Sequence, residues 1–561
     1  AGWMQEGAPN EKGPAHAGAG GASAGEKRVP ADAHIAWREA FVDLAARTPG
    51  VLVERVPRGV VLRRVRPPER SVATRAVPRL DLAPLGATAR TYSLDERHAY
   101  FGRALAGADL DGDGYDELAV GAPGHGGPGA GQTGAVYLIP GSPLQPGHEE
   151  LAANDAAAAV LEGDETFSRF GWALAAPDLN ADGIDDLAAA APTSGSSEMA
   201  FTGRVRVYLG GAGALPTEPG LELVTDETYA NLGHAIAAGD CDGDGFADLV
   251  IGSPFAPAGG AQRGRVHVIA SQSWSSLEPQ LVHDVADAAA FSVAGEGDHD
   301  WFGETLRVAR TENAGAWLLV GAPMFEVDDD HQGAGRVYGF DLAGFPDVEA
   351  SAFTLTGDAA LGRTGRGFDV LEPGGGGEAL LAVGTPTRSW SGFLSEATHA
   401  GELRLVPLGD LDGDHALDEV VVDLRVAGTE DYGRFGSLVA ARDLDQDGAG
   451  ELIVTEPWRR TAAGVTAGAL HIWDGAGGLP AGELDLDEAG AVAVEHDVAR
   501  SHLGEAVAFP DVNADGCPDL AFAAPRDRTV ARYGGRAFFV LTEDCEGTPP
   551  ATDGDADTDT D

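Results

Sequence analysis

A short apolar run that ends in a proline recurs seven times along the chain, and this repeat restricts the possible folds more than any other feature. The run reads LAVGAP at its first occurrence, LVIGSP at its third and LAFAAP at its last. Successive copies lie 62 to 71 residues apart. Their prolines are Pro123, Pro192, Pro254, Pro323, Pro386, Pro457 and Pro525. Repetition at this interval indicates seven copies of one supersecondary unit packed against each other.

Each copy reads as four short β-strands joined by turns. A Phe-Gly or Leu-Gly step precedes the apolar run, and a glycine followed by an alternating strand comes after it, as in Gly203-RVRVYL. Period-two alternation, β-branched residues and Gly/Pro punctuation favour strands over helices. The steps begin at Phe101, Phe170, Leu232, Phe302, Leu361, Phe435 and Leu503.

A four-stranded unit of this size cannot bury both of its faces alone, so the units must cover one another. The sequence therefore predicts an all-β fold, a seven-bladed β-propeller of four-stranded blades. A linear solenoid is the rival arrangement, and it is disfavoured because neither end carries a polar capping repeat. The segment Thr91-Tyr92-Ser93-Leu94, just before the first unit, is expected to supply the outer strand that closes the last blade.

An Asp-rich nonapeptide lies between the first and second strands of five units. The first copy is DLDGDGYDE, from Asp109 to Glu117. All five copies carry a carboxylate or amide at positions 1, 3 and 5, glycine at position 6 and a carboxylate at position 9. Glycine at position 6 permits the sharp turn that returns position 9 to the others. The copies span residues 109–117, 178–186, 240–248, 443–451 and 511–519.

Six or seven oxygen ligands, several of them anionic, suit Ca²⁺ better than Mg²⁺ or a transition metal. The alternative is a set of acidic β-turns, because Asp-Gly favours hairpins in any case. Carboxylates crowded into one turn would, however, repel each other without a cation. We therefore expect about five Ca²⁺ ions, with the residue at position 7 contributing its backbone oxygen. The expected ligands are Asp109, Asp111, Asp113, Tyr115, Glu117, Asp178, Asn180, Asp182, Ile184, Asp186, Asp240, Asp242, Asp244, Phe246, Asp248, Asp443, Asp445, Asp447, Ala449, Glu451, Asp511, Asn513, Asp515, Cys517 and Asp519.

A sixth acidic run, DLDGDHALD, departs from this pattern in two ways. His415 stands where glycine belongs, and the run follows the proline of unit five instead of preceding it. The sequence leaves open whether it binds a sixth Ca²⁺. Its ligands would be Asp410, Asp412, Asp414 and Asp418. Units four and five carry no nonapeptide in the usual place, so no metal is expected there.

The combination of Phe-Gly, D-x-[DN]-x-D-G-x-x-[DE] and Gly-Ala-Pro resembles the FG-GAP repeat of integrin α-subunit N-terminal propellers. Similar repeats occur in the propeller part of glycosylphosphatidylinositol-specific phospholipase D and in many bacterial surface proteins. The resemblance covers roughly residues 90–545. It implies a seven-bladed propeller whose first hairpin loops bind calcium on one face, with the carboxylates of the nonapeptides as ligands. Pairing with an integrin β-subunit is not expected, because the further domains and membrane anchor of integrin α-subunits have no counterpart in this sequence.

The flanks differ in composition from the repeats. The expected parts are a disordered Gly/Ala-rich leader (1–30), a small basic extension (31–88), the propeller (89–546) and an Asp/Thr-rich linker (547–561). Within the extension, residues 31–48 read as an amphipathic helix and residues 51–66 as a strand pair. The basic segment 51–80 either docks on the protein's own acidic surface or binds an anionic partner. Cys517 and Cys545 either form a disulfide or stay free, and the sequence leaves both possibilities open.

Acidic residues dominate the composition, with 89 Asp and Glu against 38 Lys and Arg and a formal net charge of −51. This excludes a general attraction for nucleic acid or for an anionic membrane surface, and no apolar stretch is long enough to span a bilayer. Two motifs that look catalytic lack their structural context. Gly21-Ala-Ser-Ala-Gly25 has no preceding strand, and Gly129-Ala-Gly-Gln-Thr-Gly134 leads into a strand instead of a helix. We therefore expect no enzymatic activity.

Large side chains in the second-strand loops, on the face opposite the calcium loops, are candidates for ligand binding because Trp and Arg often anchor interfaces. They are Trp390, Phe393, Trp458, Arg459 and Arg460. The sequence thus predicts a calcium-stabilised, non-catalytic binding or adhesion module for a protein or glycan. It is expected to be monomeric, extracellular or at the cell surface, and bacterial. The alternatives are a calcium-dependent glycan-active enzyme and an architectural spacer.

Overall fold

The computed structural model describes residues 51–56, 59–64, 79–81 and 89–542, the last range with gaps at 128–130, 143–147, 196–199, 275–276, 278–281, 312, 329–330, 349, 375, 392–395, 462–464, 476–478 and 497. The predicted leader, the predicted helix at 31–48 and the predicted linker lie outside these residues. The chain divides into two units, residues 1–76 and residues 77–561. In the first unit, β1 (Val51–Val56) pairs antiparallel with β2 (Gly59–Arg64), as the alternation within 51–66 indicates.

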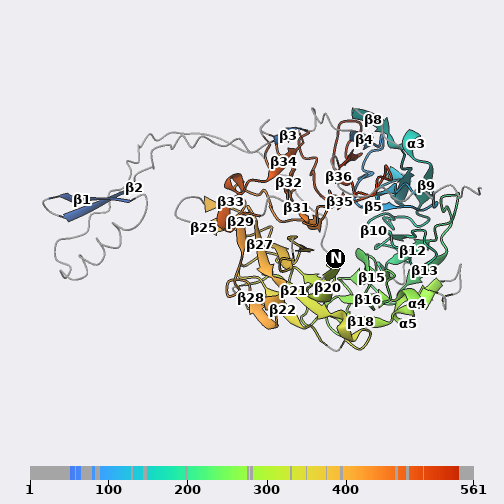
Figure 1. Ribbon diagram of the computed structural model, residues 1–561, viewed down its shortest axis with the longest axis horizontal. Coiled ribbons are helices and arrows are strands. Elements are labelled where there is room, and N and C mark those ends of the chain that lie inside the picture. The colour runs from blue at the N-terminus through green and yellow to red at the C-terminus, as the bar shows by residue number, and fades with distance from the viewer. Residues whose placement is uncertain are drawn as a thin grey trace, which may run out of the picture. The chain divides into compact units, whose positions relative to one another are not determined.

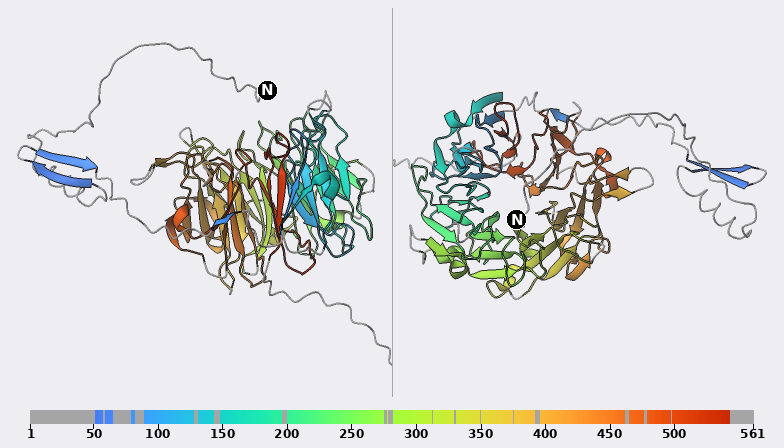
Figure 2. Two further views of the ribbon diagram at one scale, coloured as in Figure 1. Left: turned by 90° about the horizontal axis from the view of Figure 1, so that it is seen from above. Right: turned by 180° about the vertical axis from the view of Figure 1, so that it is seen from behind.

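The second unit contains seven sheets arranged around a central axis, which confirms the predicted seven-bladed propeller with four-stranded blades (Figure 1). The views in Figure 2 show the same sheets from above and from behind. Blades 1 to 3 consist of β5 (Leu105–Ala108), β6 (Glu117–Ala122), β7 (Ala135–Ile139) and β9 (Ala159–Glu162); β10 (Leu174–Ala175), β11 (Leu187–Ala190), β12 (Arg204–Tyr208) and β13 (Leu221–Val224); and β14 (Ala235–Gly239), β15 (Asp248–Ser253), β16 (Arg265–Ile269) and β18 (Phe291–Ala294).

Blades 4 to 7 repeat this order. They consist of β19 (Thr305–Thr311), β20 (Gly315–Ala322), β21 (Arg336–Asp341) and β22 (Phe353–Thr356); β23 (Gly367–Leu371), β24 (Leu380–Gly384), β27 (Glu402–Pro407) and β29 (Leu424–Ala427); β30 (Val439–Arg442), β31 (Glu451–Glu456), β32 (Ala469–Trp473) and β34 (Val492–Glu495); and β35 (Ala506–Ala508), β36 (Leu520–Ala524), β37 (Arg536–Val540) and β4 (Ala89–Ser93).

The ring is closed by a strand from the other end of the propeller sequence. β4 precedes blade 1 in the chain but pairs antiparallel with β37 of blade 7, with Tyr92 opposite Ala537. This confirms the closing strand expected from Thr91-Tyr92-Ser93-Leu94. The exchange ties the first and last blades by backbone hydrogen bonds, so the ring cannot open without breaking a sheet.

Five blades carry a fifth, parallel strand at their outer edge. The added strands are β3 (Arg79–Asp81), β8 (His148–Ala152), β17 (Val282–Asp284), β28 (Gly413–Ala416) and β33 (Gly482–Asp485). β8, β17, β28 and β33 each come from the segment that precedes the fourth strand of one blade, and each pairs with the fourth strand of the blade before it. They cover edges that would otherwise be free to pair with another chain.

The remaining short elements are α3 (Ala153–Ala156), α4 (Ser271–Trp274), α5 (Val285–Ala288), three 3₁₀ turns, and the hairpin of β25 (Trp390–Ser391) and β26 (Glu396–Ala397). Among the helices that the structure describes, none is long and apolar enough to cross a membrane.

At four of the seven blade interfaces, the glycine after the residue that bridges to the preceding blade closely approaches a glycine of the preceding apolar run. At the other three, the place of the second glycine is taken by Ala190, Thr455 or Ala523. A Cβ atom on Gly121 would lie 2.0 Å from the carbonyl oxygen of Gly171, and Gly171 itself has a φ of +82°. The residue before that glycine bridges back to the preceding blade, with Phe170 opposite Gly134. The same bridge joins Phe101 to Gly535 where the ring closes. The repeated glycines are therefore needed for backbone contact between blades.

The fifth unit uses a different step from the predicted Leu361-Gly362. Thr364 forms the bridge to Gly335, and the glycine with a positive φ is Gly365, at +86°. Leu361 is half exposed. The prediction was wrong by three residues because a Leu-Gly pair satisfies the two-letter pattern, whereas the structure requires only a glycine at the close approach.

The apolar core lies between the facing sheets of adjacent blades, in seven clusters, one for each blade interface. In the cluster between blades 7 and 1, the fully buried Phe101 packs edge-on against Tyr137, with 5.4 Å between ring centroids. Because each blade buries both of its faces in this way, the ring behaves as one packed body and holds its loops at fixed positions.

Replacing Gly121 by alanine tests the close approach between blades. The added methyl group would overlap the carbonyl oxygen of Gly171, so we expect the free energy of unfolding to fall by about 3 kcal/mol. Gly211→Ala is the control, because a Cβ atom there meets nothing within 4 Å. Chemical denaturation measures both, and equal stability of the two variants would contradict this role for Gly121.

Candidate functional site

The five nonapeptides form loops at the end of the first strand of blades 1, 2, 3, 6 and 7. In blade 1 the loop joins β5 to β6 and ends in Glu117, the first residue of β6. Position 6 has a positive φ in every copy, from +85° to +92°, and position 4 has one as well. The glycine that the sequence pattern places at position 6 therefore makes the turn that it was predicted to make.

All five loops share one set of backbone hydrogen bonds to their own carboxylates. In blade 1, the amide of Gly114 donates to Asp109 at 3.0 Å, that of Tyr115 to Asp113 at 3.0 Å, and that of Leu110 to Glu117 at 2.9 Å. The equivalent bonds occur in the other four loops. These bonds hold the carboxylates at positions 1, 5 and 9 around the centre of each loop.

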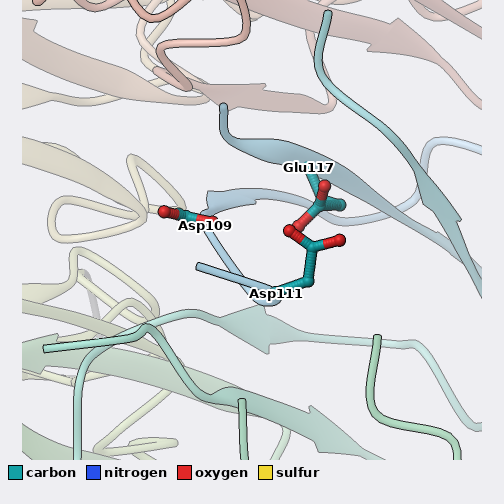
Figure 3. Close-up of side chains that lie close together, drawn as sticks. All are labelled: Asp109, Asp111 and Glu117. Carbon is teal, nitrogen blue, oxygen red and sulfur yellow. The ribbon is translucent and has the colours of Figure 1, made fainter. Parts of the chain in front are cut away.

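In three of the loops the carboxylates of positions 1, 3 and 9 come together. Asp109, Asp111 and Glu117 each offer an oxygen within 4.8 Å of the others, and Figure 3 shows Asp111 and Glu117 pointing toward one another. The same holds in blade 3 for Asp240, Asp242 and Asp248, and in blade 6 for Asp443, Asp445 and Glu451. In blades 2 and 7 position 3 is an asparagine, Asn180 or Asn513. Oxygen donors with several negative charges could hold a hard divalent cation.

The carboxylate at position 9 is held where its charge is unfavourable without a cation. Burial, followed by the negative charges of Asp111, Asp113 and Asp109, raises the pKa of Glu117 to about 8. Burial also raises the pKa of Asp519 to about 8, and that of Asp186 and Asp248 to about 6. A bound cation would reverse this effect by favouring the ionised form.

The sixth acidic run takes up another structure. Residues 413–416 form β28, an added edge strand of blade 4, in which Asp414 accepts a hydrogen bond from Thr354 at 2.9 Å. The amide of Asp412 lies 3.1 Å from Nε2 of His415. The structure therefore does not gather Asp410, Asp412, Asp414 and Asp418 as it gathers the nonapeptides. With His415 in place of glycine, the segment is extended and pairs with a strand.

The structure describes the side chains of three of the five predicted ligand-face residues, and one of these three is not exposed as expected. Arg459 is buried and makes ion pairs with Glu456 at 3.0 Å and Glu495 at 3.4 Å, so it is not an exposed anchor. Trp458 lies in the loop after β31, the second strand of blade 6, on the side of the ring away from the acidic loops, where it lines the central channel. Arg460 is exposed. The side chain of Trp390, in β25, and all of Phe393 lie outside the described residues.

One cysteine of the proposed pair is disulfide-bonded. Cys517 forms a disulfide, whereas Cys545 lies outside the described residues. Cys241 is buried and free.

A channel of about 1290 Å³ follows the propeller axis and is lined by the first strands of all seven blades. Each first strand runs from its Phe-Gly step toward the loop between the first and second strands. The Phe-Gly steps and the acidic loops therefore lie at opposite ends of the channel. We call the end at the Phe-Gly steps the axial mouth.

Five arginines line the axial mouth, although the protein as a whole is strongly acidic. They are Arg103, Arg363, Arg366, Arg434 and Arg526. Two carboxylates accompany them, with Glu304 2.8 Å from Arg366 and Glu505 3.5 Å from Arg526. Glu505 also lies 2.8 Å from Nδ1 of His502, whose ring is tilted against that of Trp458 with 4.1 Å between the centroids.

Burial alone would raise the pKa of Glu505, but the hydrogen bond to His502 and the charges of Arg526 and Arg103 hold that pKa below its usual range. Glu505 is therefore ionised and orients the imidazole. The mouth combines cations, which can neutralise an anion, with a carboxylate-oriented histidine, which can exchange a proton.

The sequence analysis did not identify this mouth, because its residues come from all seven repeats. The available signal was the residue that follows each bridging step. At these positions stand Arg103, Trp172, His234, Glu304, Arg366, Ser437 and Glu505. Each is unremarkable alone, and only the closed ring brings them together.

Comparison with known proteins identifies the repeat and a set of relatives. The FG-GAP repeat family matches residues 101–139, 170–208 and 232–269. Phosphatidylinositol-glycan-specific phospholipase D of Bos taurus is 37% identical over 418 residues, which cover 70% of this chain and 47% of the relative. The Dictyostelium discoideum protein of the same name is 28% identical over 508 residues, covering 81% of this chain and 52% of the relative. Integrin alpha-5 of Xenopus laevis is 34% identical over 179 residues, covering 31% of this chain and 15% of the integrin.

These relatives overturn the predicted function. The matches that extend over most of the chain are to proteins named as phospholipases, so the predictions of a non-catalytic adhesion module and of no enzymatic activity are wrong. The integrin match covers only about a third of the chain. The chain spans about half the length of the phospholipases that it matches. Their organisms give the predicted bacterial origin no support.

The raised pKa values of the loop carboxylates predict how the metal-free protein responds to pH. A carboxyl group whose pKa is higher in the folded protein than its ordinary value of 4.5 binds protons there that the unfolded chain has released. Folding stability should therefore fall as the pH rises from about 4.5 to about 8. We expect the melting temperature of wild-type protein in chelator to decrease over this range, and the decrease to be smaller for Glu117→Gln.

Glu218→Gln is the matched control, because Glu218 is exposed in the loop before β13. Differential scanning fluorimetry gives the melting temperatures. A decrease in melting temperature for Glu117→Gln as large as that for the control would contradict the assignment of a raised pKa to this carboxylate.

Proposed function

The chain belongs to the FG-GAP β-propeller proteins, and on that premise we propose that it acts as an enzyme in the hydrolysis of phosphatidylinositol glycans, in a calcium-loaded form. The observation that carries the proposal is the 37% identity over 418 residues to a phosphatidylinositol-glycan-specific phospholipase D. That similarity extends over 70% of the chain, well beyond the 116 residues covered by the repeat family. Because the chain spans only about half the length of this relative, the relative's name does not by itself establish the activity of this chain.

The acidic loops would hold the calcium. The proposed ligands are the carboxylate and amide oxygens at positions 1, 3, 5 and 9 and the backbone oxygen at position 7 of the five nonapeptides. Several anionic oxygens on a preformed turn fit Ca²⁺, and extracellular calcium modules bind at about 10⁻⁴–10⁻³ M. When bound, calcium would neutralise the buried carboxylates and hold the turns in place. We also propose an extracellular setting, because calcium modules of this affinity are loaded at extracellular calcium concentrations.

The axial mouth offers the substrate's phosphodiester an environment that the rest of the acidic surface does not. A phospholipase of the D type adds water across the phosphodiester bond on the head-group side, which leaves phosphatidic acid and a free inositol glycan. The arginines would neutralise the phosphate oxygens. His502 also lies at the axial mouth, and Glu505 orients its imidazole, which could accept or return a proton.

Hydrolysis of a phosphatidylinositol-glycan-anchored protein in detergent micelles tests the proposed activity. With about 1 mM Ca²⁺ we expect the substrate protein to move from the detergent phase to the aqueous phase and phosphatidic acid to accumulate. Chelator should abolish release, and readdition of calcium should restore it. Release with diacylglycerol as the lipid product, or no release at any calcium concentration, would contradict the proposal.

Calcium binding itself is tested by thermal unfolding and by native mass spectrometry. We expect calcium to raise the melting temperature by several degrees and about five ions to be counted, because five loops share the bonding pattern. Mg²⁺ at the same concentration should be much less effective, since it requires octahedral geometry. An unchanged melting temperature would sink the metal assignment.

A further inference from the structure

The axial mouth is built from equivalent positions of the repeat. In each blade, the residue after the bridging step contributes to the lining of the channel at the same end of the axis. Two of these seven residues are arginines, Arg103 and Arg366. Two more arginines come directly before the bridge residue of their blade, Arg363 in blade 5 and Arg434 in blade 6. Arg526 follows the proline of the last apolar run. The cluster therefore comes from four blades and converges on the axis.

The mouth carries an excess of positive charge. Five guanidinium groups face the two carboxylates of Glu304 and Glu505. His234 does not add to the positive charge at neutral pH, because burial lowers its pKa to about 3. Farther along the channel, Arg307 pairs with Asp369 and Arg310 with Asp240. The third arginine there, the exposed Arg442, is offset by the charges of Asp443 and Glu372 in the same lining. The excess is thus confined to the mouth.

Within the part of the chain that the structure describes, three of the five arginines form no ion pair with a carboxylate: Arg103, Arg363 and Arg434. Glu505 and Glu304 act on Arg103 only from a longer distance. Two of them lie over aromatic rings, with the Cζ atom of Arg103 4.2 Å from the centroid of Trp172 and that of Arg434 5.0 Å from the centroid of Trp458. Stacking engages the face of a guanidinium group and leaves its N–H edge available to an acceptor.

The arginines are close enough to repel one another. Burial and the charge of Arg366 lower the pKa of Arg363, and burial followed by the charges of Arg363, Arg366 and Arg526 lowers that of Arg434. For Arg103, burial is again the main cause of a lowered pKa. An anion bound among these groups would relieve the repulsion.

Three further buried polar atoms of the mouth lack partners within the described structure. The buried Nε1 of Trp172, the buried Nδ1 of His234 and Oε2 of Glu304 make no hydrogen bond to any residue that the structure describes. The other oxygen of Glu304 pairs with Arg366. Trp172 lies in blade 2 beside Arg103, and His234 of blade 3 lies on the other side of Trp172, with 5.6 Å between the two ring centroids. The indole N–H can only donate, so it calls for an acceptor, and a buried donor without one is costly.

We propose that the axial mouth is a phosphate-binding site, in which Arg103, Arg363 and Arg434 contact the phosphate oxygens. Phosphate fits because its tetrahedral oxygens can accept several charge-assisted hydrogen bonds at once, and guanidinium groups bind them in bidentate fashion. The identity of the phosphate as the phosphodiester of a phosphatidylinositol glycan substrate rests on the proposed function. Binding of the phosphate itself is measured independently of hydrolysis.

Titration calorimetry on the calcium-loaded chain tests the site with three probes: glycerophosphoinositol, which is a phosphodiester, inositol monophosphate, and uncharged inositol. We expect both phosphate compounds to bind and their affinity to fall with added salt. Uncharged inositol should not bind. Tighter binding of the diester identifies a lipid head group as the natural source, and tighter binding of the monoester a free phosphate. Equal binding of inositol and its phosphates would overturn the proposal.

Arg363→Gln and Arg434→Gln should each weaken phosphate binding about tenfold, the value of a lost charge-assisted hydrogen bond. Neither arginine has a carboxylate partner in the described structure, so replacement leaves no buried acid unpaired. Arg460→Gln is the matched control, since Arg460 is exposed and lies outside the channel lining. Unchanged melting temperatures verify folding. Wild-type affinity in both mouth variants, or equal loss in the control, would overturn the site.

The same variants separate this proposal from the proposed function. Hydrolysis that persists in variants that no longer bind phosphate would refute the mouth as the substrate site and leave the enzymatic activity standing. Phosphate binding without any hydrolysis would support the site and count against the activity.

Discussion

The close approach of glycine backbones between neighbouring blades is the constraint on which the rest of the propeller depends. Where Gly121 faces the carbonyl oxygen of Gly171, no side chain can be accommodated. A glycine with positive φ follows the bridge residue at all seven interfaces, and at four of them it meets a second glycine; at the other three it meets Ala190, Thr455 or Ala523. This approach of the backbones fixes the distance of each first strand from the axis. It also fixes which residues can reach the channel, because the next residue in the chain lines it. A sequence repeat that looks like a packing motif thus also determines the lining of the axial mouth.

The direction of the first strands gives the ring two chemically different ends. Each first strand begins at the axial mouth and ends at the opposite side, where five blades carry acidic loops. Carboxylates therefore gather at one end and unpaired arginines at the other, within one protein of net charge −51. An anionic ligand would be repelled by most of the surface and attracted to the mouth. The separation also means that the proposed calcium ions need not contact the proposed phosphate, and their effect on it would pass through the rigidity of the strands.

How far the sequence could predict the molecule depended on how local each feature is. The acidic loops lie within nine residues, so their turn geometry followed from the positions of glycine and aspartate, and the repeat predicted the seven blades and the closing strand. The step in blade 5 was misplaced because Leu361-Gly362 matches the two-letter pattern, whereas the glycine that meets the neighbouring blade is Gly365, next to Thr364. Asp410–Asp418 looked like a sixth loop, but its pairing partner is a strand of blade 4. The axial mouth depends on residues from seven repeats and emerges only when the ring is closed.

The function was the part least accessible from the motifs. Calcium loops occur in proteins of different activity, and the sequence pattern that predicts a metal does not predict a reaction. The relatives that match most of the chain are named as phospholipases, and the arginines of the axial mouth form a site that could bind the phosphate of such a substrate. The most direct test of the calcium loops and of the phosphate site is a crystal structure with calcium and glycerophosphoinositol, in which anomalous scattering locates the ions. It should show calcium in the five acidic loops and the phosphate among Arg103, Arg363 and Arg434. A phosphate bound outside the channel, or acidic loops without calcium, would contradict these assignments.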